Sequence, residues 1–64
     1  MSKQAELVVK LMSYGVPEEV QDVIGDQLQK YEDDEKKEEI ASKILDIIDG
    51  PGDTSDIIDR IKSI

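Results

Sequence analysis

Apolar side chains recur at three- and four-residue spacing in four separate segments of this chain, and glycine, proline or aspartate lies between the segments. That spacing places the apolar groups on one face of an α-helix, and no segment shows the two-residue alternation of a β-strand. The pattern therefore predicts an all-α fold. We expect a small bundle of three main helices plus a short C-terminal helix, with residues 1–64 forming a single helical domain.

The first two helices meet at the sequence YGVPEE, residues 14–19. Ser2 is a favourable N-cap for the first helix, and Gly15 occupies the place where a helix-ending glycine is expected. Pro17 suits the first position of the second helix. The apolar residues that recur at helical spacing in these two segments are Leu7, Val8, Leu11, Met12, Val20, Ile24, Leu28 and Tyr31, while Val9 and Val23 lie outside the simple stripes. We also expect Tyr14 to pack in the core at this junction. Gly25 lies inside the second helix, where glycine is unfavourable; either close packing of a neighbouring backbone or simple tolerance would explain it.

The run DDEKKEEI, residues 33–40, places seven charged residues before one isoleucine. Asp33 or Asp34 would cap a third helix there, so the run predicts a tight junction followed by exposed first turns. GPG at residues 50–52 ends that helix, and Asp53 or Thr54 would cap the fourth. The apolar faces of the last two helices consist of Ile40, Ala41, Ile44, Leu45, Ile48, Ile57, Ile58, Ile61 and Ile64, while Ile47 lies outside the simple stripe.

The chain contains neither cysteine nor histidine, so disulfides and the usual zinc ligands are excluded. Packing or oligomerisation must then stabilise a domain of 64 residues, which is near the lower size limit for folding alone. The lack of cysteine fits a reducing compartment, and no apolar stretch approaches membrane-spanning length. We expect a cytoplasmic protein that does not bind a membrane.

The segment DGPGDTSD, residues 49–56, is rich in oxygen ligands and glycine, as calcium loops are. An EF-hand loop closes with a glutamate at its twelfth position, and counting from Asp49 that position is Arg60. A helix end, a turn and an N-cap explain these residues without a metal. Since the chain also lacks a glycine-rich phosphate loop and a nucleophile–base pair, we expect no enzyme activity, no cofactor and no metal site.

Sixteen acidic residues against eight basic ones give a formal net charge of −8. Direct binding to nucleic acid needs the opposite sign, so the charge favours a partner protein with a basic surface. The candidate partner-binding carboxylates are Glu18, Asp22, Asp26, Glu39, Asp46 and Asp49. Like charges one turn apart slightly destabilise a helix, so helix stability does not explain why these carboxylates are present. An ordinary solvated face remains the plainer interpretation.

We expect the apolar content to exceed what so short a chain can bury, since a domain of this size buries about 60% of its unfolded surface. Contiguous exposed apolar surface usually marks an interface, so homodimerisation is a second hypothesis. The residues expected to serve self-association are Ile44, Ile47, Ile48, Ile57, Ile58 and Ile61.

These patterns favour a small acidic, non-enzymatic protein–protein interaction module. It would regulate or inhibit a partner protein by occupying a basic or mixed surface, in the manner of immunity factors or phage-encoded modulators. That comparison is an analogy of class. Two alternatives remain open: a DNA-mimic inhibitor that competes for a nucleic-acid-binding site, and a self-associating structural or assembly component.

Overall fold

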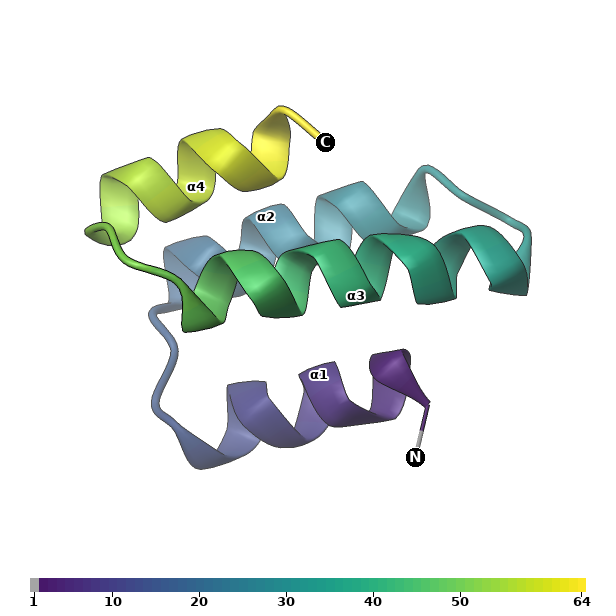
Figure 1. Ribbon diagram of the computed structural model, residues 1–64, viewed down its shortest axis with the longest axis horizontal. Helices are drawn as coiled ribbons and strands as arrows, with labels where there is room; N and C mark the ends of the chain where they lie inside the picture. Colours follow the sequence, from purple (N-terminus) through teal and green to yellow (C-terminus); the bar gives the residue numbers. More distant parts are fainter. Residues whose placement is uncertain (1) are drawn as a thin grey trace.

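The computed structural model describes residues 2–64, which fold into four α-helices. They are α1 (Lys3–Ser13), α2 (Glu18–Gln29), α3 (Asp34–Asp49) and α4 (Thr54–Lys62), and the described part of the chain contains no β-strand. The predicted fold class is therefore confirmed. Helix α1 packs mainly on α3, and α4 packs mainly on α2 (Figure 1). Further contacts of α3 with α2 and with α4 join these two pairs.

Short polar side chains begin three of the four helices. The Ser2 hydroxyl accepts a hydrogen bond from the backbone N–H of Ala5 at 3.1 Å, and it thereby satisfies a free donor in the first turn of α1. Asp33 caps α3 and Asp53 caps α4 in the same way, each through a carboxylate 2.9 Å from a backbone nitrogen. The sequence prediction of these caps is confirmed, with the earlier residue of each pair acting as the cap.

The junction of α1 and α2 depends on Gly15, whose φ of +59° lies in the left-handed region that favours glycine. Pro17 differs from expectation by one position, because it is the N-cap of α2 and its carbonyl accepts from Val20 and Gln21. Farther along α2, a Cβ added at Gly25 would meet no atom within 4 Å. Close packing of another backbone does not explain Gly25, so the structure simply tolerates it.

All four helices contribute to one hydrophobic core. Its buried apolar members are Leu7, Val20, Ile24, Ile40, Ala41, Ile44, Leu45 and Ile61. The core also encloses one polar side chain, Gln27, whose amide Nε2 donates to the Ile61 carbonyl oxygen at 2.7 Å. This bond ties the last turn of α2 to the end of α4. Its loss would leave a buried amide unpaired, which is costly.

The prediction of which residues form the buried face of α1 is partly wrong. Leu7 is buried and Leu11 packs against the core, whereas Val8 and Met12 are exposed. The two pairs lie about 100° apart around the helix, and α1 packs mainly on one neighbour, so only one pair can face inward. Tyr14 is also exposed and does not pack in the core as expected, because it caps the end of α1 on the surface.

Candidate interaction surface on α1 and α3

Two polar contacts hold α1 against α3, one near each end of α1. At its start, the Glu38 carboxylate of α3 accepts hydrogen bonds from the backbone nitrogens of Lys3 and Gln4, at 2.8 and 3.1 Å. These N–H groups stabilise the ionised form and lower the pKa of Glu38 below its ordinary value. Near its end, Lys10 forms an ion pair with Asp49 at the last turn of α3. Helix α1 is thus fixed on α3 at both ends.

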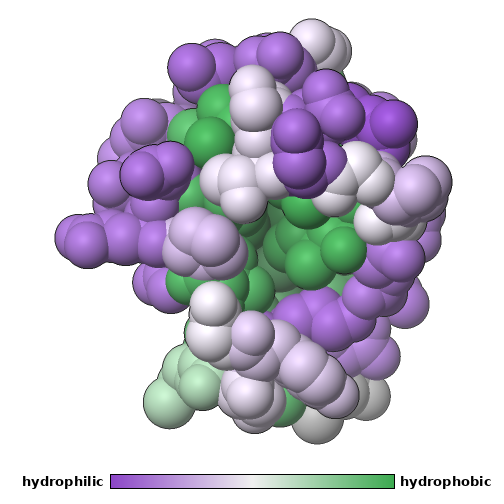
Figure 2. All heavy atoms as spheres, turned by 90° about the vertical axis from the view of Figure 1, so that its left-hand side faces the viewer, coloured by the Kyte–Doolittle hydropathy of each residue, from purple (hydrophilic) through white to green (hydrophobic). Residues whose placement is uncertain are grey.

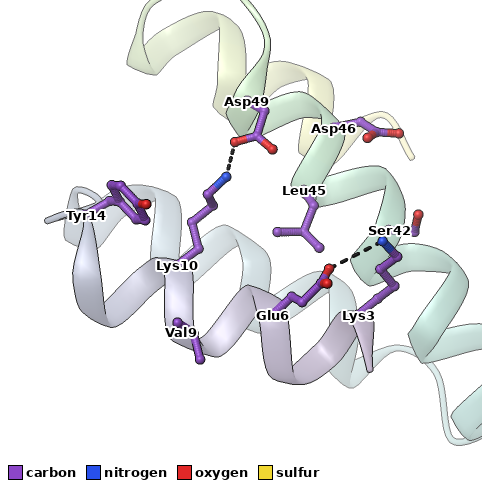
Figure 3. A pocket seen from close by; sticks show the side chains of 9 residues that line it. All are labelled: Lys3, Glu6, Val9, Lys10, Tyr14, Ser42, Leu45, Asp46 and Asp49. Atoms are coloured by element: carbon purple, nitrogen blue, oxygen red, sulfur yellow. Dashed lines mark hydrogen bonds and ion pairs between the residues drawn. The ribbon is translucent and has the colours of Figure 1, made fainter. Parts of the chain in front are cut away.

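A groove of about 310 Å³ lies between these two helices and is named the α1–α3 groove below (Figure 3). It is lined by Lys3, Glu6, Val9, Lys10, Tyr14, Ser42, Leu45, Asp46 and Asp49. In the close-up, Leu45 lies between the helices while the Lys10–Asp49 pair crosses from α1 to α3. The groove therefore combines an apolar side chain with charged groups on both sides.

The charges of the groove are largely paired. Lys3 lies 3.3 Å from the Glu6 carboxylate, and the Lys10 ammonium group lies 5.7 Å from the centre of the Tyr14 ring in addition to its contact with Asp49. Within residues 2–64, the carboxylate of Asp46 has no ion-pair or hydrogen-bond partner. Asp46 is therefore the lining carboxylate that is left for an external cation.

The six predicted partner-binding carboxylates are all exposed, but they do not form a single surface. Asp46 and Asp49 line the α1–α3 groove, whereas Asp26 lines a second hollow of about 380 Å³ between α2 and α4, together with Lys30 and Lys62. Glu39 lies 3.7 Å from the Lys36 ammonium group on α3. Since lysines pair with two of the six, the set is not a continuous row of free carboxylates. No observation favours the DNA-mimic alternative.

The residues predicted to serve self-association lie mostly inside the molecule. Ile44 and Ile61 are completely buried in the core of one chain, so they cannot contact a second copy without unfolding. That part of the prediction is wrong, because α3 and α4 bury these side chains against α1 and α2. The remaining four are half-buried and pack against the core: Ile47, Ile48, Ile57 and Ile58.

Half-buried apolar groups are nevertheless visible at one end of the bundle. Figure 2 is viewed onto the end where α1 and α3 finish and α2 and α4 begin, and it shows a recessed hydrophobic area surrounded by hydrophilic residues. We assign these apolar atoms to the edge of the core, where half-buried residues pack against its buried members.

The large apolar side chains that are exposed to solvent gather on α1 instead. Among residues 2–64, the large apolar residues exposed to solvent are Val8 (54%), Val9 (49%), Met12 (82%) and Tyr14 (74%). All four belong to α1 or to its C-cap, and Val9 and Tyr14 also line the α1–α3 groove. The sequence indicated an apolar surplus, and the structure places it on α1 rather than on α3 and α4.

The described residues contain no group of three or more His, Cys, Asp or Glu side chains arranged to hold a metal ion. None of the four helices is long and apolar enough to cross a membrane. Comparison with protein-family models, with curated proteins and with solved structures finds no match to this chain.

Proposed function

We propose that this protein is a small acidic, non-enzymatic interaction module of the cytoplasm, which regulates or inhibits a partner protein by occupying a basic or mixed surface on it. The observation that carries the proposal is a set of exposed carboxylates without a partner in the described fold. Asp22, Asp26 and Asp46 form no ion pair and no side-chain hydrogen bond within residues 2–64.

Three other carboxylates have a structural role that explains their presence. Asp33 and Asp53 cap helices, and Glu38 holds the start of α1. Asp22 and Asp26 differ, because they lie one turn apart on α2 and repel each other. Such a like-charge pair costs a helix about 0.2–0.5 kcal/mol. A cation supplied by a partner would remove that repulsion, and this is the physical reason to expect a basic surface there.

The surroundings of these carboxylates favour a partner that carries both signs of charge. Helix α2 has four carboxylates and no lysine or arginine within its bounds, whereas Lys30 and Lys62 lie beside Asp26 in the hollow between α2 and α4. A partner surface rich in lysine and arginine with an occasional carboxylate would complement this arrangement.

The proposal is tested by affinity capture with matched variants. Wild type, Asp22→Asn/Asp26→Asn and Glu32→Gln/Asp59→Asn would be used as baits in the same cell extract. Both double variants remove two exposed negative charges, so they change the net charge equally. We expect a protein that wild type and the Glu32/Asp59 variant retain and that the Asp22/Asp26 variant loses. Equal retention by all three baits would refute a role for the α2 carboxylates.

A second arm separates this function from DNA mimicry. Double-stranded DNA added to the extract should leave the captured protein bound if it recognises a protein surface, and should displace it if its nucleic-acid site is the one occupied. Displacement would replace our proposal with the DNA-mimic alternative.

A further inference from the structure

The outward side of α1 carries an apolar stripe that the core does not use. Ala5, Val8, Val9 and Met12 are all exposed, and they follow one another at intervals of three, one and three residues. Positions i, i+3, i+4 and i+7 line one face of a helix, which is the pattern found where one helix packs on another. We call these four residues the α1 stripe.

We infer that two copies of this protein associate as a twofold-symmetric homodimer, with α1 packed antiparallel on α1 of the second copy through the α1 stripe. This inference does not depend on the proposed function, because it uses a different helix and different residues. It also moves the self-association surface from α3 and α4 to α1.

The first argument is that α1 has an open side. Helix α1 buries Leu7 and packs mainly on α3, and Figure 1 shows it at the edge of the bundle with its other side free. By contrast, the large apolar side chains of α2, α3 and α4 are buried or half-buried in the described residues. The fold therefore accounts for the apolar residues of three helices and leaves one face of the fourth uncovered.

The second argument is that the stripe is complementary to itself. A twofold axis between Val8 and Val9 would place Val8 opposite Val9 of the second copy, and Ala5 opposite Met12 of the second copy. The small Ala5 side chain leaves room for the long and flexible Met12, whose exposure of 82% is the largest among these residues. A surface that fits its own copy in this way forms a closed dimer.

The third argument is electrostatic and favours α1 as the face through which two acidic copies meet. Helix α1 carries Lys3 and Lys10 against Glu6, so its net charge is positive, whereas α2 is purely acidic and α3 carries six carboxylates against three lysines. A second acidic molecule therefore meets the least repulsion at α1. A basic partner would instead be drawn to α2, which leaves the α1 stripe free for the apolar contact.

Sedimentation equilibrium across protein and salt concentration tests the association. We expect a reversible monomer–dimer equilibrium that tightens with added salt, because salt screens the repulsion between two chains of charge −8. Val8→Gln/Met12→Gln should weaken dimerisation by at least about tenfold, since both side chains would be desolvated in the dimer. Tyr14→Gln is the control, because it removes an exposed apolar group outside the stripe and should leave dimerisation unchanged.

A wild-type protein that stays monomeric and fully helical at high protein and salt concentration would overturn the inference, and the stripe would then be open to a different partner. An equal loss of dimer in the Tyr14 variant and in the Val8/Met12 variant would overturn it as well. The Asp22→Asn/Asp26→Asn variant should dimerise at least as tightly as wild type, because it lowers the repulsion between the two chains. Loss of partner binding without loss of the dimer would therefore be distinguishable from failure of the dimer itself.

Disulfide trapping tests the antiparallel arrangement itself. The natural chain has no cysteine, so Ala5→Cys/Met12→Cys introduces the sole thiols. Within one helix these positions are about 10 Å apart, too far for a disulfide within a chain. Mild oxidation should give dimers whose peptides join position 5 of one chain to position 12 of the other. Links of position 5 to 5 and 12 to 12, or no link at all, would contradict the arrangement.

Discussion

The buried amide of Gln27 offers a sharp test of how α4 is held on the bundle. Its Nε2 donates to the Ile61 carbonyl oxygen at 2.7 Å, and the side chain is 3% exposed. Gln27→Met keeps the length of the side chain and removes the donor. The Ile61 carbonyl retains a second, longer contact at 3.3 Å from the backbone N–H of Ile64. The expected loss is therefore that of one ordinary buried hydrogen bond, about 0.5–1.5 kcal/mol.

Such a loss is measurable, because a chain of 64 residues has a total stability of about 3–10 kcal/mol at typical values per residue. Urea unfolding followed by circular dichroism at neutral pH would measure it as a lower midpoint with an unchanged slope.

Gln27→Glu adds a pH signature to the same test. An ionised carboxylate at this buried position faces the Ile61 carbonyl oxygen and has no donor to offer, so the variant should be less stable than Gln27→Met at neutral pH. Burial raises the pKa of the introduced carboxyl group, and its protonated form can donate to the carbonyl. A group whose pKa is raised on folding contributes stability at low pH and loses it as pH rises, so the deficit should shrink on acidification. A deficit that stays constant with pH would refute the assigned hydrogen bond.

Three further predictions concern the core, the start of α1 and the glycines. Ile44→Ala should cost about 2–5 kcal/mol because the side chain is completely buried, and the loss should not depend on protein concentration, which unfolding at two concentrations would verify. Folding lowers the pKa of Glu38, so this residue stabilises the fold above its ordinary pKa of 4.5, and the stabilisation is lost as pH falls through the pKa of the folded state. Glu38→Gln should therefore reduce the fall in stability that acidification causes, which unfolding across pH would measure. Gly15→Ala should destabilise the protein by about 1–2 kcal/mol, because alanine is strained at the left-handed φ of this position. Gly25→Ala should stabilise it by up to about 1 kcal/mol, because the added Cβ meets no neighbouring atom. Thermal unfolding of the two single variants would measure both effects.

Local chemistry made the helices predictable from the sequence. Ser2, Asp33 and Asp53 accept from backbone N–H groups two or three residues ahead, so their roles depend on the nearby chain alone. Gly15 is equally local, since it supplies the conformation that ends α1. The spacing of apolar residues then predicted four helices with bounds close to those observed.

The interactions between helices were not predictable in the same way. Leu7 with Leu11 and Val8 with Met12 are equivalent one-turn pairs in the sequence, and the packing of α1 on α3 decides which pair is buried. Glu38 accepts hydrogen bonds from the start of α1, 35 residues away in the sequence. Its position in a run of charged residues gave no sign of this contact. Six exposed carboxylates could be named from the sequence, but the placement of Asp46 and Asp49 in one hollow and of Asp26 in another required the arrangement of the helices.

The dimer and the proposed function are compatible in this fold. A twofold contact through α1 would leave α2 of both copies exposed, so one dimer would present two sets of α2 carboxylates. If a partner offers two basic sites at a suitable separation, the second contact becomes intramolecular and the apparent affinity rises without any new contact.

The central claim is that the α2 carboxylates serve a partner and not the fold. Isothermal titration of the purified captured protein with wild type, Asp22→Asn/Asp26→Asn and Glu32→Gln/Asp59→Asn, at low and high salt, tests it most directly. We predict that the Asp22/Asp26 variant binds about three- to thirtyfold more weakly and with a smaller salt dependence, since two exposed ion pairs are each worth up to about 1 kcal/mol. Its free energy of unfolding should equal or exceed that of wild type, because a like-charge pair has been removed. Equal affinities of the two double variants, or a loss of stability that matches the loss of binding, would contradict the claim.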